Sequence, residues 1–189
     1  MIDSLGVQFV NIEGNLPTFS GVIPAYAPYA TATDMCALQN PAASTAMLRL
    51  TQIRIAGVAT AAAFADIYGQ IRTALDTGGG ITTVSTTARH DQTLGAAQQG
   101  LLVTFSSAPT LAGTVSTPRV SHQFLGVAAT AAVLPEKIWQ FGDRASQQIH
   151  LRPGQQFALN NNGAAVGAGT LLYVTFEWTE SVFGSVPVF

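Results

Sequence analysis

Short strand-like runs, some of alternating apolar and polar residues and some rich in β-branched residues, extend between turn signals from residue 47 to residue 178 of this chain. Such alternation places every second side chain on one face, which is the pattern of a β-strand with one buried face. The runs lie at 47–55, 64–72, 81–86, 101–105, 119–124, 137–141, 147–151, 155–159 and 170–178. No stretch combines a helical stripe with capping residues, and only short helical turns, for example at 96–100, remain open. The chain is therefore predicted to be all-β.

Irregularities in these runs predict one bulge and several turns. The apolar residues of 48–50 fall one step out of phase with those of 53–55, which indicates a β-bulge near Thr51–Gln52. Three glycines at 78–80 break the chain, and Pro153–Gly154 and Asn160–Gly163 are typical turn sequences. Short strands separated by such turns favour two antiparallel sheets packed face to face.

The last run carries bulky side chains on both faces. One face has Leu172, Val174, Phe176 and Trp178, and the other has Leu171, Tyr173, Thr175 and Glu177. This pattern predicts a central strand, or one whose second face meets a partner.

The two ends of the chain differ from its middle. Residues 1–46 contain four of the nine prolines and little periodicity, so we expect an extended N-terminal arm, lying either over a neighbouring subunit or along its own domain. Residues 47–180 are expected to form the β-sandwich domain, followed by an apolar C-terminal tail at 181–189. The candidate anchors between subunits are Tyr26 and Tyr29 of the arm and Phe183 and Phe189 of the tail.

Charge is scarce. Charged residues make up 10% of the chain, against about 25% in an average protein, and the net charge is −2. A surface of this kind suits burial against other chains, because no ion pair has to be desolvated in the interface. The eight basic residues are scattered singly, which argues against nucleic-acid binding.

Neither a membrane nor an oxidising compartment is indicated. The apolar stretches, of which Ala56–Ala65 is the longest rich in alanine, fall short of the about 20 residues of a membrane span. The N-terminus does not read as a signal peptide, so we expect synthesis in the cytoplasm. The single cysteine, Cys36, fits that compartment and is expected to be a small buried or interface residue.

Catalytic and metal-binding patterns are weak. The pair His90–Asp91 is a candidate base or metal ligand that His122 and His150 would have to join through the fold, but no histidines have metal-ligand spacing. A turn-stabilising role for His90–Asp91 is favoured. Glu177 and Glu180 would lie on opposite faces of a strand, so a glycosidase pair is not indicated.

The chain also has no phosphate-binding loop and no Gly-x-Ser-x-Gly elbow. We therefore expect a protein that is not an enzyme, with no cofactor and no metal.

Several segments support a resemblance to a known family. They are 48–50 with 57–63, Arg89–Asp91, Ala108–Leu111, Trp139–Gly142, Ile149–Gln155 and Thr175–Glu180. In this order they resemble a family of virion proteins of tailed bacteriophages, over residues 46 to 180. The resemblance implies a jelly-roll-like antiparallel β-sandwich that decorates or cements a viral capsid, often as a trimer.

The favoured hypothesis is thus a virion structural protein, made in the bacterial host cytoplasm, that binds the major capsid protein or other virion proteins and forms a homo-oligomer, with a trimer favoured. The first alternative is a glycan-binding jelly-roll module of a tail, collar or fibre, with Trp139 and Trp178 as stacking faces. The core is the favoured place for both tryptophans. A second alternative is a metal-dependent or sugar-cleaving enzyme on the same fold.

Overall fold

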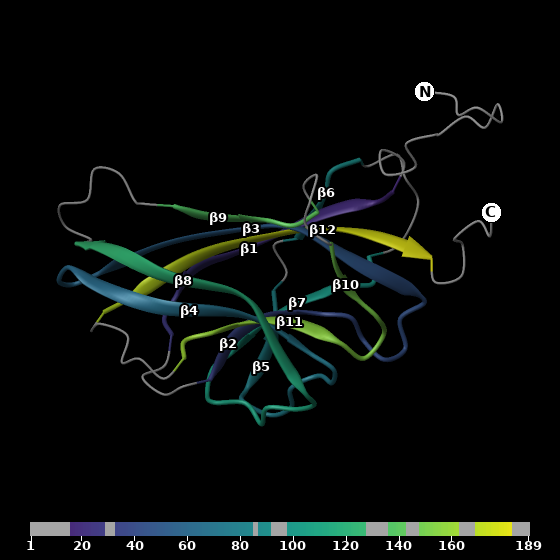
Figure 1. Cartoon of the computed structure of the whole chain (residues 1–189), viewed down its shortest axis with the longest axis horizontal. Helices are drawn as coiled ribbons and strands as arrows, with labels where there is room; N and C mark the ends of the chain where they lie inside the picture. Colours follow the sequence, from purple (N-terminus) through teal and green to yellow (C-terminus); the bar gives the residue numbers. More distant parts are fainter. Residues whose placement is uncertain are drawn as a thin grey trace.

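The fold was analysed in a computed structural model of the chain (Figure 1). The structure describes residues 16–28, 33–84, 87–91, 98–127, 136–142, 148–162 and 169–182. Every regular element in these ranges is a β-strand, which confirms the all-β prediction.

Twelve strands occur in the described residues. They are β1 (Thr18–Tyr26), β2 (Asp34–Gln39), β3 (Ala46–Ala59), β4 (Ala63–Arg72), β5 (Ile81–Thr83), β6 (Thr87–Arg89), β7 (Leu101–Phe105), β8 (Val115–Val127), β9 (Lys137–Gln140), β10 (Ile149–Leu151), β11 (Gln156–Asn160) and β12 (Leu171–Val182).

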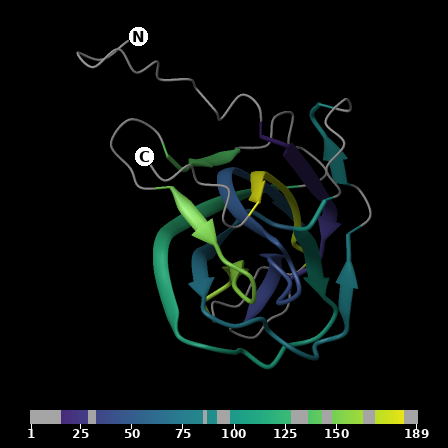
Figure 2. The ribbon, with the colours of Figure 1, turned by 90° about the vertical axis from the view of Figure 1, so that its right-hand side faces the viewer.

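The strands form one strongly curled sheet whose two halves face each other. The order is β5-β7-β2-β11-β4-β8-β3-β12-β1-β6, and β9 and β10 pair with β3 outside this path. In Figure 1 the half with β9, β3, β12 and β1 lies above the half with β8, β4, β11 and β2, and Figure 2 shows the strands surrounding a common interior. We call them the upper and lower sheets. The predicted sandwich-like fold is confirmed.

Strand β8 joins the two sheets. It pairs antiparallel with β4 in the lower sheet, and its end pairs parallel with β3 in the upper sheet through Val58↔Gly126 and Ala59↔Val127. Along the rest of its length β3 has β12 on one edge and β10 and β9 on the other. Apart from the β3–β8 contact, the strand pairs of the described residues are antiparallel.

The core lies between the sheets. Strand β12 is central, as its two bulky faces predicted, and Leu172, Val174, Phe176 and Trp178 are fully buried. They pack with Leu50 and Ile53 of β3 and with Phe157 of β11 from the lower sheet. Burying such side chains contributes about 1.5–3 kcal/mol each, so this cluster dominates the stability of the fold.

Local irregularities occur where the sequence predicted them. The β3–β12 register shifts between Trp178↔Leu50 and Glu177↔Gln52, so that Thr51 is the extra residue of a bulge. Its hydroxyl donates a hydrogen bond to the carbonyl oxygen of Glu177 at 2.9 Å. Gly154, in the turn between β10 and β11, has a positive φ of 83°.

The described part of the predicted arm differs from the expectation. Residues 18–26 form β1, which pairs with β12 and β6, and residues 34–39 form β2, which lies between β11 and β7. The β-domain therefore begins well before residue 47. The prolines misled the prediction because Pro24 sits at a bulge, where Ala25 has a φ of 48° and the register shifts. Of the two placements considered for the arm, the described residues take the one along their own domain.

The domain also ends slightly later than expected. Ser181 and Val182, assigned to the tail by sequence, continue β12 and pair with Met47 and Ala46. Residues 183–189 lie outside the described residues, as do residues 1–15.

Two connections cover part of the outer face of the lower sheet. The β4–β5 connection, residues 73–80, and the β7–β8 connection, residues 106–114, bond to each other through the Thr77↔Thr110 bridge and between Thr73 and Thr114. We call these two connections the cover. The cover reaches the outward side chains of β11 and β4, because Asp76 donates its backbone N–H to Gln156 Oε1 and its carboxylate lies 3.7 Å from Arg72 Nε.

Candidate interaction surface

The ribbon formed by β4 and β8 carries the largest group of exposed hydrophobic side chains on a single pair of strands. Its register places Phe64 opposite Phe124, Asp66 opposite His122, and Tyr68 opposite Val120. Residues directly opposite each other in an antiparallel pair point to the same face. These six side chains therefore form one outward surface, which we call the β4–β8 patch.

Contacts within the patch hold it in shape. The Phe64 ring stacks on His122 with centroids 4.6 Å apart, and Phe124 meets Phe64 edge-on at 5.4 Å. His122 Nδ1 is hydrogen-bonded to Asp66 Oδ1. Despite these contacts Phe64 is 54% exposed, Val120 59% and Phe124 42%. Three large apolar side chains are thus exposed on one face.

The opposite face of the same ribbon is buried. Ala65 and Ile67 of β4 and Leu125 of β8 belong to the core. Both faces of the ribbon therefore carry apolar side chains, and in the described part of the chain only the inner face is covered. A clustered, exposed apolar surface of this kind marks an interaction site more often than isolated exposed hydrophobics do.

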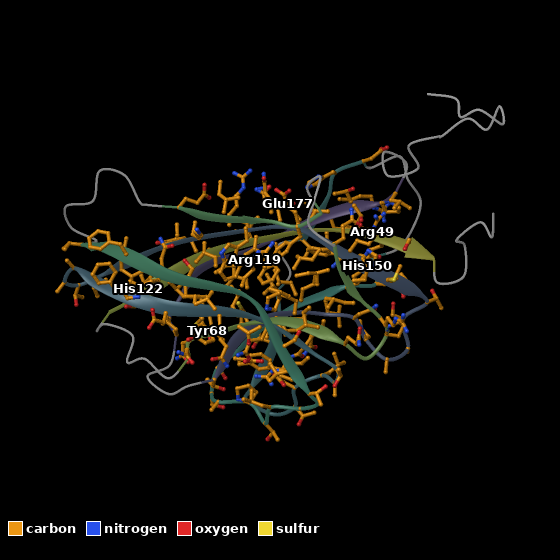
Figure 3. The ribbon with its side chains drawn as sticks, in the orientation of Figure 1. Arg49, Tyr68, Arg119, His122, His150 and Glu177 are labelled. Atoms are coloured by element: carbon orange, nitrogen blue, oxygen red, sulfur yellow. The ribbon has the colours of Figure 1, made fainter. Side chains whose placement is uncertain are left out.

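The outer face of the upper sheet is a second, more polar surface. Val22, Thr175, Arg54 and Ile138 form a row across β1, β12, β3 and β9. Beside this row lies a shallow pocket of about 330 Å³. Its lining is Thr51, Gln52, Gln140, Phe141, Gly142 and Glu177. Figure 3 labels Glu177 on this upper side, whereas Tyr68 and His122 lie on the lower sheet.

Among the predicted interface residues, only Tyr26 is described. It is partly buried, and its hydroxyl donates a hydrogen bond to the carbonyl oxygen of Phe105 at 2.8 Å, which ties β1 to β7 within the chain. Tyr29, Phe183 and Phe189 lie outside the described residues. Their role as intersubunit anchors stays a prediction.

The structure places the three histidines on different elements. His90 follows β6 and donates its backbone N–H to Thr18, His122 lies on β8, and His150 lies on β10. Figure 3 shows His122 and His150 toward opposite ends of the molecule. Burial, with the nearby charges of Arg49 and Arg152, lowers the pKa of His150. Within the described ranges, His, Cys, Asp and Glu side chains form no group of three suited to a metal ion.

The two glutamates of β12 point to opposite sides, as expected. Glu177 faces the outer pocket, whereas Glu180 is buried and accepts hydrogen bonds from Trp178 Nε1 and the backbone N–H groups of Gln99 and Gly100. Glu180 thus holds the chain segment before β7 against β12. This is a structural use of a buried carboxylate, since its oxygens are satisfied by donors.

Both tryptophans and the cysteine lie in the interior, as favoured. Trp139 is 4% exposed, Trp178 is 0% exposed and Cys36 is 1% exposed. Burial raises the pKa of the Cys36 thiol far above its ordinary value. The tryptophan faces proposed for sugar stacking are therefore in contact with the core.

A polar cluster that the sequence did not indicate is buried where the cover meets the lower sheet. Arg72 donates from Nε and Nη2 to the two oxygens of Asp34, at 2.5 and 2.9 Å, and Asp34 also accepts from Asn160 Nδ2. Asp76 lies 3.7 Å from Arg72 Nε and accepts the N–H of Ala112. Burial, followed by the neighbouring Asp34, raises the pKa of Asp76 to about 6.

No family model, no curated protein and no solved structure matches the chain. In the part of the chain that the structure describes, no helix is long and apolar enough to cross a membrane.

Proposed function

We propose that the chain is a non-enzymatic structural protein of a bacteriophage particle, which decorates the capsid by packing its sheet faces against other protein chains. The β4–β8 patch carries this proposal, because Phe64, Val120 and Phe124 lie together on one face and the described residues leave them exposed. The scarcity of charge over the whole chain supports it as well. The phage setting rests on the sequence resemblance over residues 46 to 180.

The architecture suits binding by surface area. The patch stands on strands whose other face is fixed in the core, so little side-chain or backbone freedom is lost when a partner covers it. The row across the upper sheet offers a second surface on the opposite side of the molecule. Contacts made through two surfaces act together, since removal of the protein from a shell requires all of them to break.

The test uses purified protein and empty shells of the phage that encodes it. We expect the protein to co-sediment with expanded shells and to raise their calorimetric melting temperature. The double variant Phe64→Thr/Phe124→Thr should lose most of this effect, whereas Ile81→Thr, at an exposed position of β5 outside both surfaces, serves as the matched control. If the wild-type protein neither binds shells nor changes their melting, the proposal is wrong.

One observation keeps the glycan-binding alternative in view. The pocket on the upper sheet is lined by hydrogen-bonding side chains, among them Gln52, Gln140 and Glu177, of the kind that sugar hydroxyls need. Binding on a glycan array that disappears with Gln52→Ala and Gln140→Ala would move the assignment to a tail or fibre module. We expect no such binding, because both tryptophans are buried.

A further inference from the structure

The β4–β8 patch has an internal symmetry that bears on the identity of its partner. Each of its three cross-strand pairs takes one residue from β4 and one from β8. The outer pairs, Phe64 with Phe124 and Tyr68 with Val120, are apolar or aromatic on both strands. The middle pair joins an acid, Asp66, to a base, His122.

We propose that the β4–β8 patch binds a second copy of this chain face to face, about a two-fold axis that runs along the ribbon between β4 and β8. Such an axis lays β4 of one copy over β8 of the other. Phe64 then meets Phe124 of the second copy, and Tyr68 meets Val120. The contact is isologous, because the same surface serves both subunits.

The middle pair explains why the axis runs along the strands. This axis brings Asp66 of each copy over His122 of the other, so that acid faces base twice. His122 uses Nδ1 for Asp66 of its own chain, which leaves Nε2 for the second copy. An axis across the strands would instead place Asp66 against Asp66 and His122 against His122, and juxtaposed like groups are unfavourable.

The same argument favours a second copy over a partner of one charge sign. An acidic partner would meet Asp66, and a basic partner would meet His122, so each would oppose one group of the patch. A surface that carries one acid and one base side by side is matched best by a second copy of itself, rotated so that each acid lies over a base. This inference deepens the proposed function, because it names the occupant of the surface on which that function rests.

The size of the patch sets the expected strength. Residues 64 to 68 span five strand positions, or about 17 Å at ~3.3 Å per residue, and the patch is two strands wide. Stable interfaces bury about 800 Å² per partner, so this contact belongs to the weak class. We expect a monomer–dimer equilibrium with a dissociation constant in the micromolar range or above, strengthened where copies are held close together on a shell.

Sedimentation equilibrium of the full chain, from micromolar to millimolar concentration, tests the stoichiometry. We expect a reversible dimer that Phe64→Thr weakens at least tenfold. Asp66→His alone and His122→Asp alone should each weaken it, while the double exchange should restore it, because acid again faces base. A monomer at every concentration, a trimer, or equal effects of the single and double exchanges would overturn the proposal.

Cross-linking tests the axis. Tyr68→Cys is treated with a short bismaleimide spanning about 10 Å, the usual separation of stacked sheets. The proposed axis keeps residue 68 of both copies at the same end of the contact, about one strand spacing apart, so this variant should cross-link to itself, and the native Cys36 is buried. An axis across the strands would move the two copies of residue 68 apart by four residues, or about 13 Å at ~3.3 Å per residue. Absence of self-linking in a Tyr68→Cys protein that still dimerises would therefore contradict this axis.

The outcomes separate the inference from the proposed function. Shell binding that depends on Phe64 in a protein that never dimerises would show that another chain occupies the patch, which sinks the inference alone. Dimerisation without any shell binding would sink the proposed function alone.

Discussion

The two ends of strand β4 differ sharply in how their outward side chains are surrounded. At one end, Arg72 lies beneath the cover, 5% exposed, in a network with Asp34 and Asp76. At the other end, Phe64 stands in solvent, 54% exposed. The described residues thus cover the charged end of the strand and leave the apolar end exposed.

Burying the charged side chains of β4 and exposing an apolar one is the reverse of what solvation alone favours. Buried charges are costly unless they are paired and hydrogen-bonded, whereas an exposed phenylalanine forgoes the gain of about 25 cal/mol per Å² of burial. The covered region offsets its cost with the bonds around Asp34. Among residues 16–182 as far as the structure describes them, nothing covers the open region, and we therefore assign its burial to another chain.

The strongest test of the covered region is Arg72→Ala. The change removes the one cation of the cluster and leaves Asp34 and Asp76 buried near each other, so we expect a loss of about 3–5 kcal/mol in the free energy of unfolding. Urea denaturation measures it. Arg54→Ala, on the exposed face of β3, is the matched control and should change stability by less than about 0.5 kcal/mol. Similar losses in both variants would mean that the covered cluster has no special role.

A second test uses pH. The pKa of Asp76 is raised from 3.8 to about 6 on folding, so the folded state binds its proton more tightly than the unfolded chain does. The stabilisation is therefore fully present below pH 3.8 and is lost as the pH rises through about 6. We expect a loss on the order of 2 kcal/mol over this window. Chemical denaturation at a series of pH values measures it.

The comparison variant is Asp76→Asn, which keeps an oxygen for Ala112 N–H but has no proton to lose. His150 gives the opposite slope, because its lowered pKa favours the folded state only when the ring is neutral. The difference between wild type and Asp76→Asn cancels that contribution. A difference that does not change between pH 4 and pH 6 would rule out Asp76 as its source.

A third test places a side chain between the two connections that form the cover. Gly113 has a φ of 71°, and a Cβ there would lie 2.6 Å from the backbone nitrogen of Ala74, in the other connection. Gly78 has a similar φ of 68° but open space around it. Gly113→Ala should therefore cost about 1–2 kcal/mol more than Gly78→Ala, measured by thermal unfolding. Equal costs would show that the two connections do not press on each other.

The fold was largely predictable because strand signals are local. The alternation of β12 and the phase shift at Thr51 require only neighbouring residues, and both predictions are confirmed. Strand β2 was missed because Asp34 and Gln39, polar residues at its two ends, are buried by the cover. That burial involves connections that begin 34 residues after the end of β2, and no local pattern shows such a contact.

The candidate surface was less predictable for a related reason. Phe64 and Ile67 both read as core residues of one apolar strand, and the sequence does not say which face the cover and the upper sheet leave open. The register of β4 with β8 decides it, since it unites Phe64 with Phe124 on the outer face. Tyr26, chosen from its place in the predicted arm, proved instead to bond within its own domain.

The smallest expected change in stability comes from a substitution in the β4–β8 patch itself. Phe64→Ala should lower the free energy of unfolding by less than about 1 kcal/mol, because the side chain is mostly exposed and rests only on its neighbours. Phe157→Ala, the same change at a fully buried position of the lower sheet, should cost about 3–5 kcal/mol. Urea denaturation at a protein concentration well below one micromolar, under the expected dissociation constant of the dimer, keeps self-association out of the comparison. A loss at Phe64 approaching that at Phe157 would mean that the patch serves the fold of its own chain, and its exposure would then carry no argument for a partner.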